Sequence, residues 1–135
     1  MTKVTEVLEQ MRASRQRILE QLKGVAEEQM LAEAEWSQRQ VTVRFMFYRL
    51  ITHEVEHTVH LLKTLDSLGI AQSEAELILR RLQATRGELE GLLMGLSDEE
   101  LDRVPTEGEW SVRQVLEHIT DTEERYSKRI LDALP

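Results

Sequence analysis

The sequence EWSVRQVLEHITDTEERY, at residues 109–126, decides the predicted fold. Ser111 and Gln114 have the spacing of a capping box, in which each side chain accepts a hydrogen bond from the backbone N–H of the other residue at the start of a helix. Beyond them, apolar residues recur at intervals of three or four, as on one stripe of an amphipathic helix. This stripe consists of Val112, Val115, Ile119, Ile130 and Leu134. The stretch therefore predicts a helix over residues 111–133.

Three further stretches of the chain show the same apolar spacing. They predict helices over residues 2–23, 38–68 and 73–94. Proline, which interrupts helices, occurs only at positions 105 and 135, outside all four ranges. Because the stripes of four such helices can share one core, the predicted fold class is all-α, a four-helix bundle. A chain of 135 residues is expected to form one domain, covering residues 1–135.

The sequence also contains an internal repeat. EWSQRQ at residues 35–40 aligns with EWSVRQ at residues 109–114. The repeat indicates two helix-loop-helix halves, each with a long internal connection, joined by a short link around SLGIAQS. In the first half, Ser37 and Gln40 offer a capping box that is expected to start the second helix.

The two long connections carry further structural signals. Ser97 and Glu100, in SDEELDRVP, have capping-box spacing and predict a short extra helical turn. Trp36 and Trp110 precede the two proposed caps, and each is expected to pack its connection against the core.

The composition limits the classes of function. Asp and Glu number 25 against 17 Lys and Arg, a formal net charge of −8, and no clustered basic stretch occurs, so no nucleic-acid partner is expected. The chain has neither a run of about 18 apolar residues nor an apolar N-terminal segment. No membrane partner is therefore expected, and a soluble, cytoplasmic protein is predicted. Since cysteine is absent, any metal must be held by nitrogen and oxygen atoms.

Three of the four histidines lie in THEVEHTVH, residues 52–60. His53, His57 and His60 fall within a narrow arc of a helix, so that two of them can hold one ion. HEVEH also matches the HExxH pattern of zinc proteases, and Glu54-x-x-His57 matches half of a di-iron site. The lack of a predicted strand weakens the protease interpretation, and the lack of a second ExxH pair weakens the di-iron one. A polar helix margin without metal stays an alternative.

The fourth histidine, His118, lies near the middle of the predicted helix over residues 111–133, at the margin of its apolar stripe. His53 has the same kind of position on its own helix. If the two helices pack side by side, His53, His57 and His118 can converge as a face of three nitrogens. Such a site leaves coordination positions open for water or substrate, as catalytic metal sites do.

These segments resemble the DinB/YfiT-like superfamily of four-helix metalloenzymes. GLSDEELDRVP (95–105) and EWSVRQVLEHITDTE (109–123) resemble the family hairpin that carries a lone metal histidine. TVRFMFYRLITHEVEHTVHLLKTLDSLG (42–69) resembles the family's last helix, whose HxxxH supplies the other two ligands. The order of the two hairpins is reversed here, as if the chain were circularly permuted. The triad is therefore expected either within one chain or between the subunits of a homodimer.

The resemblance implies a ligand set and a type of chemistry. His53, His57 and His118 would bind a divalent ion, zinc or nickel, which lowers the pKa of a thiol or a water. Family members include thiol S-transferases and isomerases that use low-molecular-weight thiols such as bacillithiol, mycothiol or glutathione. The resemblance thus implies a metal-dependent enzyme, a thiol S-transferase or hydrolase, with a small-molecule substrate that can be such a thiol.

Several neighbouring residues are expected to support this site, and none is assigned a catalytic role. Asp121 and Thr122 follow His118 by about one helical turn and can fix its imidazole by hydrogen bonding. Glu54 and His60 are expected to support the ligands or line the pocket, and His60 stands where the family often has glutamine or another polar residue.

Two further questions stay open at the level of sequence. Arg15 and Arg86 occupy equivalent positions in the repeat, close to the apolar stripes, and each can meet an anionic substrate, pack its stem or form an ion pair. The alternative to an enzyme is a non-catalytic four-helix domain that binds metal or mediates an interaction.

Overall fold

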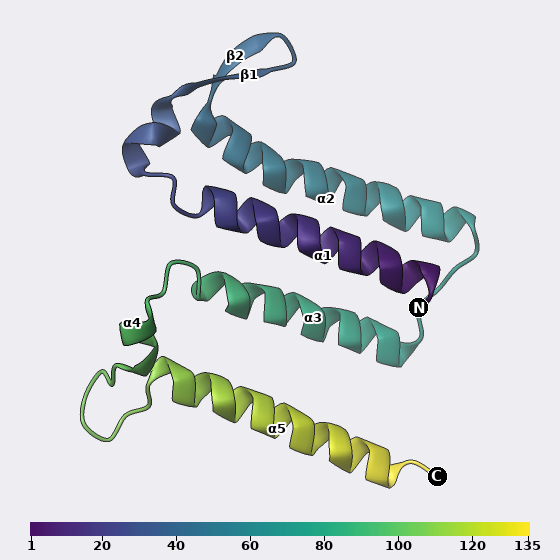
Figure 1. Cartoon of the computed structure of the whole chain (residues 1–135). Coiled ribbons are helices and arrows are strands. Elements are labelled where there is room, and N and C mark those ends of the chain that lie inside the picture. The colour runs from purple at the N-terminus through teal and green to yellow at the C-terminus, as the bar shows by residue number, and fades with distance from the viewer. The chain divides into compact units, whose positions relative to one another are not determined.

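The structure is a computed structural model that describes all 135 residues and is dominated by helices (Figure 1). Five α-helices, a 3-10 helix and two short strands follow in this order: α1 Lys3–Leu22, η1 Glu27–Leu31, β1 Glu33–Trp36, β2 Arg39–Thr42, α2 Val43–Ser67, α3 Glu74–Leu92, α4 Asp98–Asp102 and α5 Val112–Ala133. The all-α fold class is confirmed. The four long helices α1, α2, α3 and α5 correspond to the four predicted ones.

The chain divides into two compact units, Met1–Leu92 and Leu93–Pro135. The first contains α1, the strand pair, α2 and α3, and the second contains α4 and α5. Apolar stripe residues are left uncovered within their own unit: Val115 and Ile130 of α5 are 41% and 62% exposed. The packing of the four stripes into one bundle, and the single domain over residues 1–135, therefore stay predictions.

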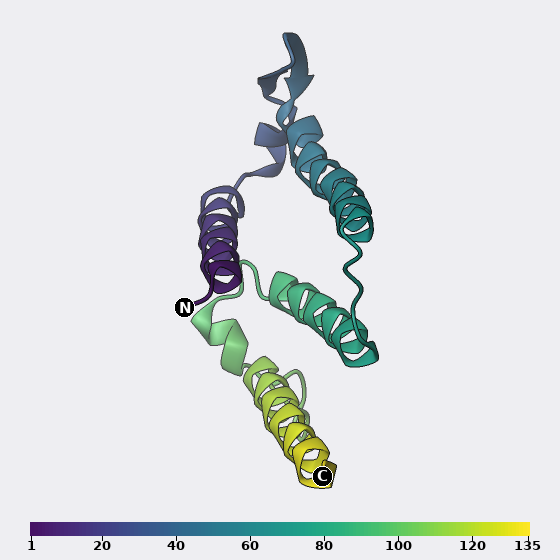
Figure 2. The same ribbon diagram turned by 90° about the vertical axis from the view of Figure 1, so that its right-hand side faces the viewer.

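The connection between α1 and α2 differs from the prediction. β1 and β2 form an antiparallel hairpin in which Trp36 pairs with Arg39 (Figures 1 and 2). The two turn residues, Ser37 and Gln38, have φ angles of 50° and 64°, and positive φ at both positions is typical of the type I′ turn of tight hairpins. This strand pair was not expected from the sequence.

The predicted capping box of Ser37 and Gln40 is wrong, because a helix N-cap needs an extended backbone and Ser37 is left-handed. Helix α2 begins at Val43 instead of residue 38. Its N-cap is Thr42, whose hydroxyl accepts a hydrogen bond from the backbone N–H of Phe45 at 3.1 Å.

Trp36 packs the hairpin onto the start of α2. Its ring lies 5.2 Å from the ring of Phe45, and the guanidinium groups of Arg39 and Arg49 lie 5.1 and 5.5 Å from its centroid. The backbone N–H of Val43 also donates to the carbonyl of Ala32 at 2.9 Å. The tryptophan thus holds its connection by contacts with α2, as expected, although the connection is a hairpin.

In the second unit, both predicted capping boxes are confirmed. The Ser97 hydroxyl accepts from the Glu100 N–H at 3.1 Å, and the Ser97 N–H donates to the Glu100 carboxylate at 3.0 Å, which starts α4. Ser111 and Gln114 exchange the same two bonds, at 3.2 and 2.8 Å, at the start of α5. Ser111 is only 5% exposed, so the start of α5 is the best-enclosed point of the chain.

An ion pair connects α4 to α5. The guanidinium of Arg113 donates from Nε and Nη2 to the two carboxylate oxygens of Asp102, at 2.5 and 3.2 Å. Such two-bonded pairs fix the orientation of both groups as well as their distance. The pair therefore sets how α4 lies against the first turn of α5, the helix that carries His118.

Candidate metal centre

The three clustered histidines form a row on the exposed surface of α2. The rings of His53 and His57 lie 4.5 Å apart, centroid to centroid, in an edge-to-face arrangement with an interplanar angle of 61°. The rings of His57 and His60 lie 5.6 Å apart, and their Nδ1 atoms are separated by 3.4 Å. The helical spacing therefore brings the three side chains together on one face, as the sequence predicts.

Glu54, beside His53, forms an ion pair with Arg15 of α1. The two side chains are about half exposed, at 59% and 54%. Arg15 was expected to meet an anionic substrate, to pack its stem or to form an ion pair, and in the structure it forms an ion pair. The carboxylate that a zinc protease of the HExxH type would use as its base is thus bound to a guanidinium within the first unit.

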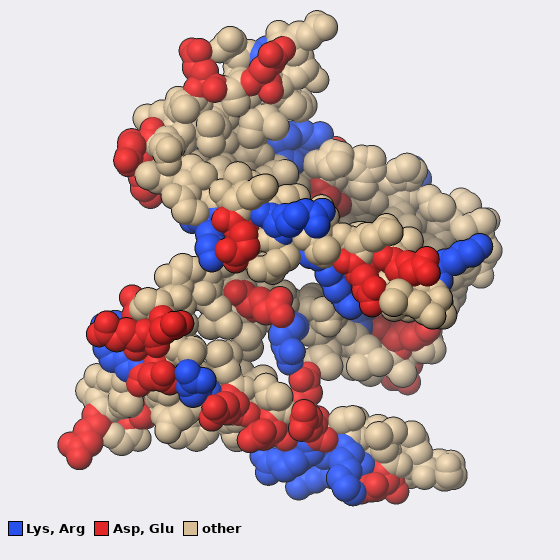
Figure 3. Space-filling model, in the orientation of Figure 1, with Lys and Arg blue, Asp and Glu red and all other residues tan.

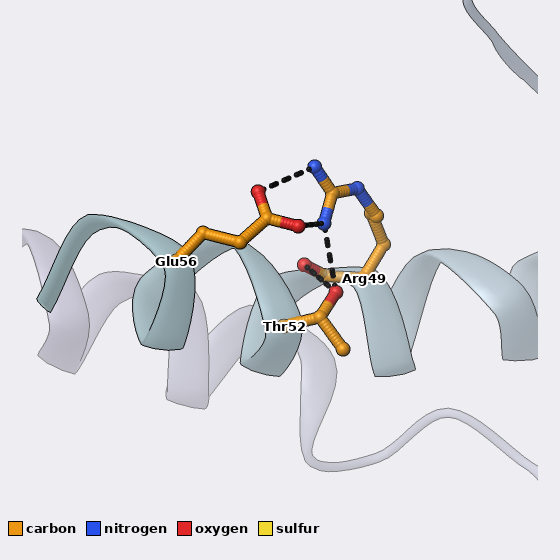
Figure 4. Close-up of polar contacts among 3 residues, drawn as sticks. All are labelled: Arg49, Thr52 and Glu56. Atoms are coloured by element: carbon orange, nitrogen blue, oxygen red, sulfur yellow. Dashed lines mark hydrogen bonds and ion pairs between the residues drawn. The ribbon is translucent and has the colours of Figure 1, made fainter. Parts of the chain in front are cut away.

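A second ion pair, Arg49 with Glu56, runs along α2 over two helical turns (Figure 4). Arg49 donates from Nη1 and Nη2 to the two carboxylate oxygens of Glu56 at 2.9 and 3.1 Å, and Nη1 also donates to the Thr52 hydroxyl at 2.8 Å. The hydrogen bond from Arg49 lowers the pKa of Glu56 below its usual value, and the positive charge of Arg49 lowers it further. Glu56 is therefore a fixed negative charge beside the histidine row.

The role of Glu56 was missed from the sequence. The signal was the spacing of seven residues between Arg49 and Glu56, which returns to the same helix face after two turns. Because Arg49 also lies over the ring of Trp36, its guanidinium connects the hairpin to the carboxylate of Glu56.

His118 lies on α5 in the second unit, with the ring of Trp110 5.0 Å away and tilted by 59°. Arg125 donates from Nη2 to the Thr122 hydroxyl at 3.0 Å, and from Nε to the backbone carbonyl of Asp121 at 3.4 Å. The imidazole of His118 contacts the ring of Trp110. A supporting role of Asp121 and Thr122 toward the imidazole stays a prediction.

The ligand triad is divided between the two units. His53 and His57 belong to Met1–Leu92, and His118 belongs to Leu93–Pro135. No three His, Asp or Glu side chains of the structure lie within the reach of one metal ion. The convergence of His118 with the pair on α2 stays a prediction.

The helices also bear on the expected partners. None of them combines the length and the apolar character that crossing a bilayer requires. On the face seen in Figure 3, acidic and basic side chains lie close to one another on most segments. The expectations of a cytoplasmic location and of no nucleic-acid partner stay predictions.

The structure places this chain in the class of all-α proteins, with long helices joined by structured connections. Residues 81–135 match the family model of the DinB superfamily, which confirms the DinB-like resemblance. The match covers less than half of the chain and includes His118 with its capping box and Trp110, whereas His53 and His57 lie outside it. No curated protein and no solved structure gives a significant match.

Proposed function

We propose that the chain is a divalent-metal-dependent enzyme of the DinB-like type, in which His53, His57 and His118 hold zinc or nickel. The observation that carries the proposal is the contact of the His53 and His57 rings, 4.5 Å apart on one face of α2. The DinB superfamily match over the helix of His118 supports the third ligand. Cooperation of the three histidines requires α5 to meet α2, within one chain or across a homodimer.

The donor set fits these metals. Imidazole nitrogen is a ligand that suits zinc and nickel, and the chain has no thiolate that would compete with it. Three protein ligands leave at least one coordination position for a small molecule. When bound, the ion lowers the pKa of a thiol or a water in that position and so supplies a nucleophile.

Contacts of the neighbouring side chains support the proposal. Trp110 restricts the ring of His118 by contact. Arg15 neutralises Glu54, which follows His53 directly, so that this carboxylate is held by a cation beside the site. Glu56 is ionised because the hydrogen bond from Arg49 lowers its pKa, and Arg49 balances its charge in the same ion pair. We infer a low-molecular-weight thiol or water as the nucleophile and a small electrophilic molecule as the substrate.

Metal analysis of protein purified without a histidine tag tests the ligand set. We expect about one zinc or nickel per chain in the wild type, and its loss in His53→Ala and in His118→Ala. Lys63→Ala, a change on the same helix as His53, is the matched control and should keep its metal. Undiminished metal in His118→Ala contradicts the triad.

The enzymatic part is tested separately. The thiol conjugation of an electrophilic model substrate, and its hydrolysis without thiol, are measured with and without a chelator. We expect turnover that the chelator abolishes and added metal restores. Bound metal without chelator-sensitive turnover of either kind would favour the alternative, a non-catalytic metal-binding or interaction domain.

A further inference from the structure

The distance between the Nδ1 atoms of His57 and His60 matches the distance between two ligand atoms of a tetrahedral metal ion. Their Nδ1 atoms are 3.4 Å apart. Two nitrogens bound at about 2.0–2.1 Å to one tetrahedral ion stand about 3.3–3.4 Å apart. Hydrogen bonds from N–H groups are commonly shorter, at about 2.7–3.2 Å. The contact is thus a long hydrogen bond between the two rings, and the same distance also suits two ligands of one ion.

The helix backbone favours this pair. Residues three apart are neighbours on a helix surface, and Nδ1 is the imidazole nitrogen nearer to the backbone. Because both residues lie inside the 25-residue helix α2, their backbone positions are fixed before any ion arrives.

We propose that His57 and His60 form a two-histidine site, through their Nδ1 atoms, for a divalent transition-metal ion that favours tetrahedral geometry. This site lies on α2 alone and does not require His118. The nearby carboxylates are engaged elsewhere, Glu54 with Arg15 and Glu56 with Arg49. The remaining coordination positions are thus left to solvent or to donors from another molecule.

The new site and the triad compete for His57. A neutral imidazole has one acceptor nitrogen, so His57 can serve one ion at a time. A chain with both ligand sets therefore binds one ion through His57, whichever set is occupied. Removing His118 isolates the pair of His57 and His60.

The test uses Co²⁺, whose visible absorption is strong in tetrahedral sites and weak in octahedral ones. Tag-free His118→Ala protein is titrated with Co²⁺, followed by the double variants that add His60→Ala or His53→Ala. Far-UV circular dichroism checks that each variant keeps its helix content, which these exposed surface changes should leave intact.

We expect His118→Ala to be purified without bound metal, and then to bind one added Co²⁺ per chain with the strong absorption band. The added His60→Ala should remove the band and weaken affinity by more than the about 10–100-fold that losing a supporting residue costs. The added His53→Ala should leave both unchanged.

Absence of the band in His118→Ala, or its persistence after His60→Ala, overturns the two-histidine site. Loss of the band after His53→Ala does so as well, because it assigns the ion to His53 and His57. The triad test measures the metal that copurifies with the wild type and with His118→Ala, whereas this test measures Co²⁺ added to metal-free protein.

Discussion

The two copies of the EWS-x-RQ motif have identical residues at five of six positions. The first copy forms a β-turn and the second starts a helix. In the first copy, Ser37 is left-handed with φ 50° and sits in a β-turn. In the second, Ser111 is extended with φ −74° and ψ 166° and caps α5. The position that differs is Gln38 in one and Val112 in the other.

This one position explains the difference. A type I′ turn needs positive φ at both central residues, and a β-branched side chain strongly disfavours positive φ. Gln38 tolerates a φ of 64°, whereas Val112 excludes the turn and takes the first helical position after its cap. Val41, Thr42 and Val43 after the first copy add β propensity that the second copy lacks. A motif thus specifies structure only together with the residue that sets its backbone angles.

The largest effect is expected for Gln38→Val, which gives the first copy the residue of the second. A β-branched side chain at this φ should destabilise the hairpin by about 2 kcal/mol. Amide hydrogen exchange of β1 and β2 should accelerate accordingly. Gln38→Gly is the control, and it should slow exchange because glycine adopts positive φ freely. Equal exchange in Gln38→Val and the wild type contradicts the explanation.

A smaller effect is expected for Ser111→Ala, which removes the cap of α5. Loss of an N-cap hydroxyl costs about 1 kcal/mol, so the free energy of unfolding in urea should fall by that amount. Ser37→Ala, at the same place in the first copy, removes no cap and should cost less than about 0.5 kcal/mol. Similar losses in the two variants would show that Ser37 also caps a helix.

Arg39→Ala tests the packing of the hairpin on α2. Arg39 lies 5.1 Å from the Trp36 centroid, and an exposed cation–π contact contributes about 0.5 kcal/mol. A correspondingly small decrease in thermal stability is expected. Arg44→Ala, near the start of α2, serves as the control and should leave stability nearly unchanged.

The smallest effect is an acid sensitivity of the second connection. The hydrogen bond from Arg113 lowers the pKa of Asp102 below its usual 3.8, and the backbone N–H of Ser97 lowers that of Glu100 below 4.5. A lowered pKa in the folded state gives stability above the unfolded value that is lost as the pH falls through the folded value. Below about pH 4 we therefore expect the amides of α4 to be less protected from exchange, once the rates are corrected for the intrinsic pH dependence of exchange. Salt should weaken the effect because these groups are exposed.

The control for this pH dependence is Asp102→Asn. It should weaken the contact of α4 with α5 at neutral pH and remove the part of the acid response that belongs to the ion pair. An unchanged response in Asp102→Asn would assign the acid sensitivity to Glu100 and its cap.

Local patterns predicted most of the helical structure. Apolar spacing gave four helices, and the capping boxes at Ser97 and Ser111 are confirmed because both signals act within one or two helical turns. The repeat predicts that Ser37 caps a helix as Ser111 does, and the hairpin departs from that prediction. The residue at the variable position of the motif differs in branching, Gln38 in one copy and Val112 in the other. This difference affects which backbone φ is accessible, and the shared residues do not encode it.

In the candidate site, too, local contacts could be predicted from the sequence, and the packing of separate helices could not. The contact of His53 with His57 follows from helical periodicity and is confirmed. The approach of His118 depends on how the apolar stripes of α2 and α5 pack, and stripe patterns leave the partner and the register open. The ion pair of Arg49 with Glu56 was accessible in principle from its seven-residue spacing.

The two tryptophans have a practical consequence, since each unit contains one of them. Trp36 lies beneath two guanidinium groups in the first unit, and Trp110 contacts His118 in the second. Replacing either with phenylalanine leaves a chain with a single indole emitter. Its fluorescence then reports one unit at a time, and emission from Trp110 would respond to ligation at His118 if the proposed metal binds there.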